Sequence, residues 1–295
     1  MNDGHLNKIT KIDCIEGMKS IDTNSIDVII ADPPYNIGKD FGNNITKQEI
    51  KDYINWSLLW INEASRTLND SGTMFIYGFS EILAHISVNI DLPHRWLIWH
   101  YTNKNIPSLK FWQRSHESIL CVWKEKPLFN LDDVREEYTE SFLKNAAGKT
   151  RKNTKGRFSS GDKTTTYNAH SKGALPRDVI KTPALAGGAG RKERWFYCKD
   201  CRDSYEPKEK NNHEKCNLVI HPTQKPESLT LRLIKSSINK EKINNILIPF
   251  AGSGVECIVS KREGHNFIGF EINSDYINLA SKRIEKTNVD AKLFN

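Results

Sequence analysis

The sequence lacks any long apolar segment, and this absence excludes a membrane-spanning helix. No hydrophobic run among its 295 residues approaches the length of about 20 residues that a helix needs to cross a bilayer. The polar residues 1–5 are followed by no apolar stretch of the kind found in a secretory leader. We therefore expect a cytoplasmic protein with no membrane partner.

Cysteine is scarce, with six residues at positions 14, 121, 198, 201, 216 and 257. These do not form the even framework of a small disulfide-bonded secreted domain, so structural disulfides are not expected. Three of them stand with a histidine as Cys198-x2-Cys201 and His213-x2-Cys216. Two pairs of soft ligands at this spacing predict a closed, structural zinc site with four protein ligands. The alternative is that these are ordinary reduced cysteines.

Acidic residues are scarce in one part of the chain. Between Lys144 and Lys199, fourteen lysines and arginines stand against three acidic residues, a net charge of +11 that leaves −4 for the rest of a chain with +7 overall. A polyanion such as DNA or RNA would explain a positive segment on a mildly acidic body. The alternative is a solvated charged loop. The candidate nucleic-acid contacts are Arg151, Lys152, Lys155 and Arg157.

Clear periodicity is missing from about residue 126 to 216, where Lys, Arg, Gly, Ser, Thr and Asn prevail. Such a stretch is too long for an ordinary loop, and the aromatic residues between its charges suit stacking on nucleic acid. A chain of 295 residues can hold one large α/β domain and a smaller insertion. We therefore divide the chain into residues 1–125, an insertion over 126–216, and residues 217–295.

The stretch Ser25–Asn36 organises the first of these parts. Its apolar run is too short for a helix and rich in β-branched residues, which predicts a buried strand that stops at Pro33 and Pro34. Asp32 and Tyr35 then lie at the carboxyl end of a strand, the edge where open α/β sheets bind ligands. The prolines donate no backbone hydrogen bond and have a fixed φ, so the turn is stiff and presents carbonyl acceptors. A carboxylate, carbonyls and an aromatic ring suit a flat molecule with an NH₂ group.

Strand and helix patterns alternate through residues 1–125 and again after 217, which is typical of a doubly wound α/β sheet. The predicted strands are Ile9–Ile12, Ile26–Ala31, Thr73–Tyr77, Arg95–Tyr101, Glu117–Trp123, Asn245–Pro249 and Asn266–Phe270. The predicted helices are Cys14–Lys19, Ile50–Leu68, Glu81–Asn89, Glu227–Ser237 and Val255–Arg262.

The last βαβ unit carries the pattern of a nucleoside site. Its first strand leads into the glycine turn Phe250-Ala251-Gly252-Ser253-Gly254, and its second strand ends at Glu271. The glycines allow a ligand to approach the backbone closely, and the acid can accept both hydroxyls of a ribose. Cys257 takes the place of the third glycine of the dinucleotide pattern, which disfavours NAD, and the turn has no basic residue for phosphates. The adenosine part of S-adenosylmethionine fits better; the alternative is a purely structural turn.

Three motifs occur in a characteristic order: Asp32-Pro33-Pro34-Tyr35, then, after the basic insertion, His221-Pro222-Thr223-Gln224-Lys225-Pro226, then the glycine turn of 250–254. This order resembles the beta class of DNA amino-methyltransferases, which modify adenine N6 or cytosine N4. The resemblance covers about residues 6–125 and 217–288. It implies an α/β, Rossmann-like S-adenosylmethionine-dependent methyltransferase fold with a mixed, mostly parallel sheet and a basic target-recognition insertion. Double-stranded DNA is the implied partner, while a homodimer and a cognate restriction endonuclease stay open.

The resemblance also implies roles for individual residues. Asp32 and the Pro33 carbonyl, in the stiff turn with Pro34, would accept hydrogen bonds from the amine of a flipped-out base, and Tyr35 would stack on that base. The methyl transfer would then need mainly positioning and electrostatics. The residues implied to bind the cofactor are Asp32 together with Asp13 at the adenine, Glu271 at the ribose, Thr223 and Lys225 near the methionine end, and Phe250, Ala251, Gly252, Ser253 and Gly254 of the turn.

Two positions depart from the family pattern, in which Ile248 is usually an aspartate and Ile12 usually a glycine. We nevertheless expect activity, because Asp13, Asp32 and Glu271 remain. Aspartate as the first catalytic residue favours adenine N6, since cytosine N4 members more often begin with serine. Cytosine N4 is the alternative substrate. An RNA methyltransferase and an inactive DNA-binding relative, the latter suggested by Ile248, are further alternatives.

Overall fold

The structure, a computed structural model, describes residues 3–38, 47–103, 108–157 and 159–289. It divides into two compact units, one of Met1–Phe129 with Asp178–Asn295 and one of Asn130–Arg177. The separate unit is narrower than the insertion that we predict over 126–216, because residues 178–216 fold with the larger unit. The functional division of the chain at 125 and 217 stays a prediction.

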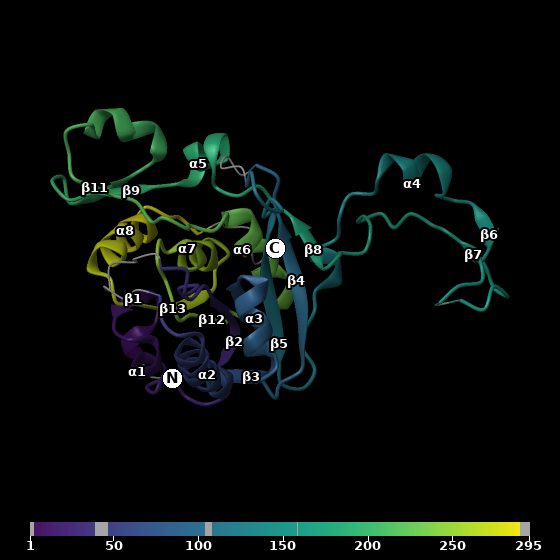
Figure 1. Ribbon diagram of the computed structural model, residues 1–295, viewed down its shortest axis with the longest axis horizontal. Helices are drawn as coiled ribbons and strands as arrows, with labels where there is room; N and C mark the ends of the chain where they lie inside the picture. Colours follow the sequence, from purple (N-terminus) through teal and green to yellow (C-terminus); the bar gives the residue numbers. More distant parts are fainter. Residues whose placement is uncertain (1–2, 39–46, 104–107, 158, 290–295) are drawn as a thin grey trace. The chain divides into compact units, whose positions relative to one another are not determined.

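An eight-stranded sheet forms the centre of the larger unit (Figure 1). Its strands lie in the order β1-β13-β12-β2-β3-β5-β4-β8, and β5 is antiparallel to both of its neighbours while the other five pairs are parallel. The predicted mixed, mostly parallel sheet is confirmed. In chain order the strands are β1 (Lys8–Lys11), β2 (Ile26–Ala31), β3 (Leu68–Gly78), β4 (His94–His100), β5 (His116–Trp123), β8 (Val179–Lys181), β12 (Asn245–Ile248) and β13 (Asn266–Glu271).

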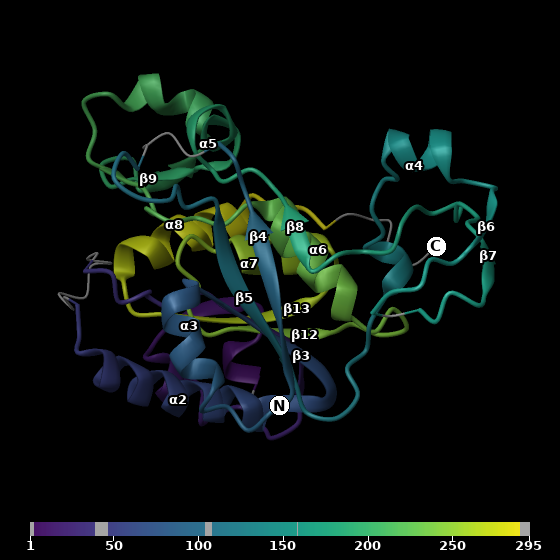
Figure 2. The same cartoon turned by 45° about the vertical axis from the view of Figure 1, so that its right-hand side comes forward.

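Helices cover both faces of this sheet (Figure 2). One face packs against α1 (Cys14–Met18), α2 (Ile50–Thr67) and α3 (Ser80–Ser87), and the other against α6 (Glu227–Ser237), α7 (Val255–Arg262) and α8 (Ser274–Glu285). A short 3-10 helix, η1 (Asp3–His5), precedes β1. No helix within the described ranges combines the length and the apolar character needed to cross a membrane.

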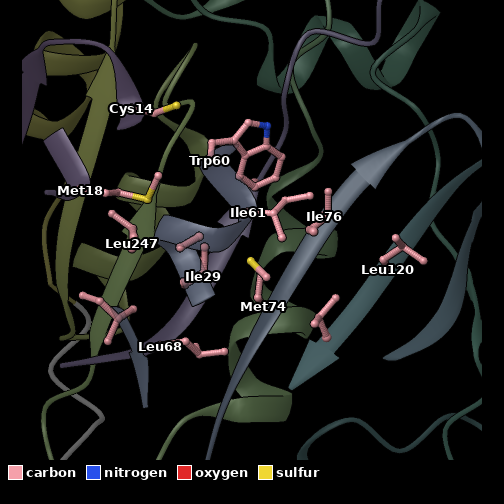
Figure 3. Close-up of a cluster of buried hydrophobic side chains, with 14 of the residues drawn as sticks. Cys14, Met18, Ile29, Trp60, Ile61, Leu68, Met74, Ile76, Leu120 and Leu247 are labelled. Carbon is pink, nitrogen blue, oxygen red and sulfur yellow. The ribbon is translucent and has the colours of Figure 1, made fainter. Parts of the chain in front are cut away.

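The position of β2 between β12 and β3 explains why its sequence, apart from Asp27, is apolar without alternation. All six of its residues are buried. Ile29 and Ala31 belong to the apolar cluster beneath α1–α3, whereas Val28 and Ile30 belong to the cluster beneath α6 and α7. A parallel strand covered on both faces favours apolar residues at nearly every position. The exception is Asp27, whose buried carboxylate accepts hydrogen bonds from Asn69, Lys242 and the Asn245 N–H. Figure 3 shows the first cluster, in which Trp60 of α2 lies among side chains from several strands.

The strand β3 starts earlier than its sequence pattern indicates. The predicted strand is Thr73–Tyr77, yet β3 begins at Leu68, which pairs with Ile26. The register then shifts before Val28 pairs with Thr73. A bulge of this kind takes up the extra polar residues without ending the strand.

A smaller sheet of order β10-β9-β11 also belongs to the larger unit and packs against α8. Its elements are α5 (Gly187–Glu193), β9 (Phe196–Cys198), β10 (Asp203–Tyr205), the 3-10 helix η3 (Pro207–His213) and β11 (Leu218–Val219). These short strands show no periodicity that sequence analysis could detect. Phe196 and Cys198 are nevertheless almost completely buried, so this part of the chain has a small core of its own.

The unit Asn130–Arg177 has little core. It contains η2 (Leu131–Asp133), α4 (Glu140–Asn145) and a hairpin of β6 (Thr150–Lys152) and β7 (Thr164–Thr166). Among its described residues, Val134 alone is buried. This agrees with a segment whose sequence shows no apolar period.

Candidate active site

A cavity of about 290 Å³ lies at the carboxyl edge of the large sheet. Its walls come from the segments that follow β1, β2, β12 and β13, from the start of β5, and from the turn 221–226. Open α/β sheets bind their ligands at this edge. The turn of residues 32–35 and the glycine turn of residues 250–254, which are far apart in the chain, therefore contribute to one cavity.

The cavity brings together nearly all predicted site residues. Its lining includes Asp13, Asp32, Pro33, Pro34, Tyr35, Thr223, Lys225, Phe250, Ala251, Gly252, Ser253 and Glu271. Gly254 is absent from the lining; its φ is 76°, and a Cβ on it would lie 2.6 Å from the Cβ of Ala280. Gly254 is thus required for close packing of the turn against α8 rather than for an open wall. Contacts of the other residues with a ligand stay predictions.

Two side chains, Lys225 and Tyr35, contact the Asp32 carboxylate, and both also lie near Glu117. Lys225 Nζ donates a hydrogen bond to Asp32 Oδ2 at 2.6 Å, and Tyr35 Oη donates to Oδ1 at 2.8 Å. Tyr35 Oη also lies 2.8 Å from Glu117 Oε2, and Lys225 Nζ lies 3.7 Å from that same oxygen. A phenol carries one proton, so Tyr35 donates to only one carboxylate at a time. Lys225 therefore holds Asp32 from one side, while the proton of Tyr35 is shared between Asp32 and Glu117.

The protonation of this network follows from burial and charge. Burial raises the pKa of Tyr35 well above its usual value, and the charges of Asp32 and Glu117 raise it further. Burial acts to lower the pKa of Lys225, but the neighbouring Asp32 and Glu117 outweigh it, so the pKa of Lys225 is raised. Tyr35 is consequently a neutral donor and Lys225 a permanent cation.

The turn after β2 is anchored independently of any ligand. Tyr53 Oη of α2 donates to the Pro34 carbonyl at 2.7 Å. The Asn36 side chain accepts from the Gln48 backbone N–H at 2.7 Å and donates to its carbonyl at 3.0 Å. No hydrogen bond within the described part of the chain uses the Pro33 carbonyl, so this acceptor is available to a ligand.

The part of the cavity beside the glycine turn is built around Glu271 at the end of β13. Its Oε2 accepts from the Gly252 N–H at 2.9 Å, and its Oε1 accepts from the N–H groups of Ile272 at 2.9 Å and Asn273 at 2.8 Å. Burial raises the pKa of Glu271, although these backbone donors oppose the shift. A Cβ on Gly252, whose φ is 48°, would stand 2.9 Å from a ring nitrogen of His221. Glycine is therefore needed where the turn meets His221.

Aromatic side chains pack against one another in the wall of the cavity. The Phe250 ring contacts Trp56 and Trp60 of α2, with ring centroids 5.9 Å and 5.2 Å apart. Tyr35 packs edge-on against Phe79 at a centroid distance of 5.0 Å. Trp56, which is not among the predicted site residues, lines the cavity.

The cavity is strongly acidic. Its carboxylates are Asp13, Asp32, Glu117, Glu256 and Glu271, and its lysine is Lys225. Burial, aided by the charge of Asp32, raises the pKa of Glu256 to about 7. Even with Glu256 protonated, negative charge prevails, which favours a ligand that carries positive charge.

Glu117 and Glu256 line the cavity but are not among the residues predicted from the sequence. Glu117 stands near the start of β5, and an antiparallel strand brings its first residues to the edge where the parallel strands end. Glu256 lies in the first turn of α7, buried to 5% exposure. By contrast, Ile248 is fully buried among apolar side chains and does not line the cavity. Of the two residues that depart from the family pattern, Ile248 is thus part of the core, whereas Ile12 lines the cavity.

The remaining predicted residues lie outside the cavity. The ligand atoms of Cys198, Cys201, His213 and Cys216 come within 4.8 Å of one another, as their spacing predicts for a metal site. Arg151, Lys152, Lys155 and Arg157 are exposed on the unit Asn130–Arg177, the first two on β6. Their contact with nucleic acid stays a prediction.

Comparisons with known proteins agree with this geometry. The model of the family N6_N4_Mtase, described as DNA methylase, matches residues 26–282. The DNA adenine methyltransferase YhdJ of Escherichia coli (strain K12) is 31% identical over 279 residues, which make up 92% of this chain and 81% of the relative. The cytosine-N4-specific PvuII DNA methyltransferase has a TM-score of 0.62 at 13% identity, covering 97% of this chain and 89% of that one. The M1.HpyAVI–SAM complex has a TM-score of 0.52 at 20% identity, covering 94% and 98%. The predicted fold is confirmed.

Proposed function

The chain belongs to the DNA methylase family, and from this premise we propose that it transfers a methyl group from S-adenosylmethionine to the N6 amine of adenine in double-stranded DNA. One observation carries the proposal: Asp32 and the glycine turn held by Glu271 face the same cavity. The proposed acceptor for the base amine and the proposed site for the nucleoside therefore line the same cavity.

Charge supports S-adenosylmethionine as the methyl donor. This molecule supplies an electrophilic methyl group on a positively charged sulfur. The cavity offers five carboxylates and one lysine among its lining residues, a balance that attracts a cation. Glu271 is the group proposed to bind the ribose, and Asp13 the adenine. The name of the M1.HpyAVI–SAM complex, a protein of similar fold, agrees with this choice.

The residues around Asp32 suit an amine acceptor. The lone pair of an adenine amine is delocalised into the ring, and acceptors for its two hydrogens make that lone pair more available. Asp32 and the Pro33 carbonyl are the two proposed acceptors. As the new N–C bond forms and the C–S bond breaks, positive charge develops on the nitrogen. The Asp32 carboxylate stabilises this charge and accepts the departing proton, while Lys225 and Tyr35 keep it oriented.

The choice of adenine rests on two observations. Aspartate begins the motif at position 32, and YhdJ, described as a DNA adenine methyltransferase, shares 31% of its aligned residues with this chain. Cytosine N4 is the second candidate, because the PvuII enzyme has the same fold and is described as cytosine-N4-specific. Both amines require the same acceptors.

The test is methyl transfer from labelled S-adenosylmethionine to duplex DNA and to RNA of the same sequence. We expect label in the DNA only. Label in RNA alone would contradict the DNA substrate. No label in either, together with no calorimetric signal on titration with S-adenosylmethionine, would instead identify an inactive binding protein.

A further inference from the structure

Four side chains of the kinds that bind metal ions lie close together beside the small sheet. Cys198 ends β9, Cys201 lies in the following turn, His213 ends η3, and Cys216 follows it. All four ligand atoms lie within 4.8 Å of one another, and Cys201 Sγ is 3.6 Å from His213 Nδ1. A tetrahedral zinc ion with bonds of about 2.0 to 2.3 Å separates its ligands by roughly 3.5 to 4 Å. The cluster is therefore close to the geometry of such a centre.

We propose that Cys198, Cys201, His213 and Cys216 bind one Zn²⁺ ion in a structural site. Three thiolates and an imidazole are a donor set that selects zinc over calcium or magnesium. Four protein ligands leave no open position for a substrate, so the ion takes no part in methyl transfer. The proposal does not depend on the proposed function.

The surrounding side chains orient the ligands. The His213 ring lies against Tyr205, with centroids 4.1 Å apart, and edge-on to Phe196 at 5.5 Å. This packing leaves Nδ1 facing Cys201. The Cys201 N–H lies 3.4 Å from Cys198 Sγ, and a backbone donor of this kind stabilises a thiolate ligand. The packed His213 ring and the backbone N–H that donates to Cys198 Sγ are typical of the side chains and backbone groups that orient metal ligands.

A metal explains how such short strands stay together. The strands β9 and β10 have three residues each and β11 has two, too few to form a stable sheet alone. The ion links the end of β9 to the residues that follow η3. It thereby holds together the module formed by residues 196–219. Metal-binding free energy then becomes folding free energy.

Hydrogen bonds connect this module and the residues just before it to α8 and to the turn 221–226 of the candidate active site. Ser204 Oγ of β10 donates to the Leu279 carbonyl of α8 at 3.0 Å. Just before β9, the Glu193 carbonyl accepts from Gln224 at 2.7 Å, and Arg194 donates to the His221 carbonyl at 3.1 Å. These bonds hold the turn 221–226 that lines the cavity. Loss of zinc is therefore expected to loosen that turn.

The first experiment measures metal content in the full chain, purified without a histidine tag or chelator. Plasma mass spectrometry should find about one zinc ion per chain. Cys198→Ser should reduce the content to about a tenth or less, because one ligand is lost. Cys121→Ser is the matched control, since Cys121 lies on β5 outside the cluster, and it should keep its zinc. Wild-type protein with well under half an ion per chain, and with thiol reactivity unchanged by added zinc, would overturn the proposal.

A second measurement uses wild-type protein alone, so it does not depend on the folding of a variant. After zinc is replaced by Co²⁺, visible absorption from cobalt–thiolate bonds should appear, and its absence would contradict the ligand set. Hydrogen exchange before and after chelation tests the connection to the site. Faster exchange in β9, β10 and the turn 221–226 is expected, with β2 unchanged; equal exchange throughout would remove the structural role.

Discussion

The ammonium group of Lys225 lies 2.6 Å from Oδ2 of Asp32, although 193 residues separate them in the chain. Both side chains are shielded from solvent, with exposures of 3% for Lys225 and 16% for Asp32. This pair joins the turn 221–226 to the turn after β2. It also provides the positive charge that allows Asp32 and Glu117 to stand beside the same phenol.

Removing the cation should destabilise the protein. Lys225→Met keeps the length of the side chain but leaves two carboxylates beside each other in a buried site. We expect the free energy of unfolding to fall by about 3 kcal/mol or more, and methyl transfer by at least about tenfold. Urea denaturation and steady-state kinetics measure these effects. Lys282→Met is the control, because Lys282 pairs with Glu285 at the surface, where a pair contributes about 0 to 1 kcal/mol. A Lys225→Met variant as stable as Lys282→Met would contradict the buried pair.

The parts of this site that the sequence predicts are those carried by local pattern. The apolar run of β2, the double proline, the glycine turn and the acid after β13 each lie within a few residues of the feature they specify. The pairing of Lys225 with Asp32 and that of Glu117 with Tyr35, 82 residues apart, depend on strand order. No local period encodes strand order, so sequence analysis found Lys225 only through the family resemblance and missed Glu117.

The same reason explains the boundary of the insertion. The strand β8 has three residues in a stretch without periodicity, yet it pairs with β4 and joins residues 178–216 to the larger unit. Its membership of the sheet follows from tertiary pairing rather than from propensity. The proposed metal ligands, in contrast, can be selected from the sequence, because the spacing of three cysteines and a histidine predicts a zinc site.

Stability should depend on pH through Glu256. Burial raises its pKa from the ordinary value of 4.5 to about 7, so between these values the folded state holds a proton that the unfolded state has released. The contribution of protonated Glu256 to the free energy of unfolding is therefore fully present below pH 4.5, and it is lost as the pH rises to about 7. Glu256→Gln removes this loss and should be more stable than wild type at pH 8 by up to about 3 kcal/mol.

Urea denaturation of both proteins from pH 5 to pH 8 measures the effect of Glu256 as a difference. The advantage of Glu256→Gln should grow across this range and level off above pH 7. A difference that does not change with pH would show that the carboxyl does not titrate in this window.

Glu271 should contribute to cofactor affinity. A hydrogen bond to a charged group contributes about 1.5 to 3 kcal/mol, so Glu271→Ala should weaken S-adenosylmethionine binding about 10-fold to 100-fold. Calorimetry measures this, with Glu285→Ala, an exposed acid of α8, as the control. Because Glu271 also holds Gly252, a 2′-deoxy analogue of the cofactor separates the two roles. The analogue should bind more weakly than the cofactor to wild type but equally to Glu271→Ala; an unchanged penalty would exclude a ribose contact.

The basic residues on the unit Asn130–Arg177 should determine the salt dependence of DNA binding. Replacing Arg151, Lys152, Lys155 and Arg157 by glutamine should reduce the slope of log affinity against log salt by about 0.9 for each phosphate that the protein no longer neutralises. A control with the same charge change is the quadruple replacement of the exposed lysines Lys8, Lys11, Lys51 and Lys126. Equal slopes for the two variants would mean that the segment is a solvated loop.

Asp32 is proposed to direct methyl transfer to adenine N6. The most direct test is mass spectrometry of nucleosides from unmethylated duplex DNA treated with S-adenosylmethionine and either wild type or Asp32→Ala, with folding checked by circular dichroism. We predict N6-methyladenine from wild type and none above background from a folded Asp32→Ala variant. N4-methylcytosine from wild type would show that cytosine is the target base, and N6-methyladenine undiminished in the variant would show that Asp32 does not direct the transfer.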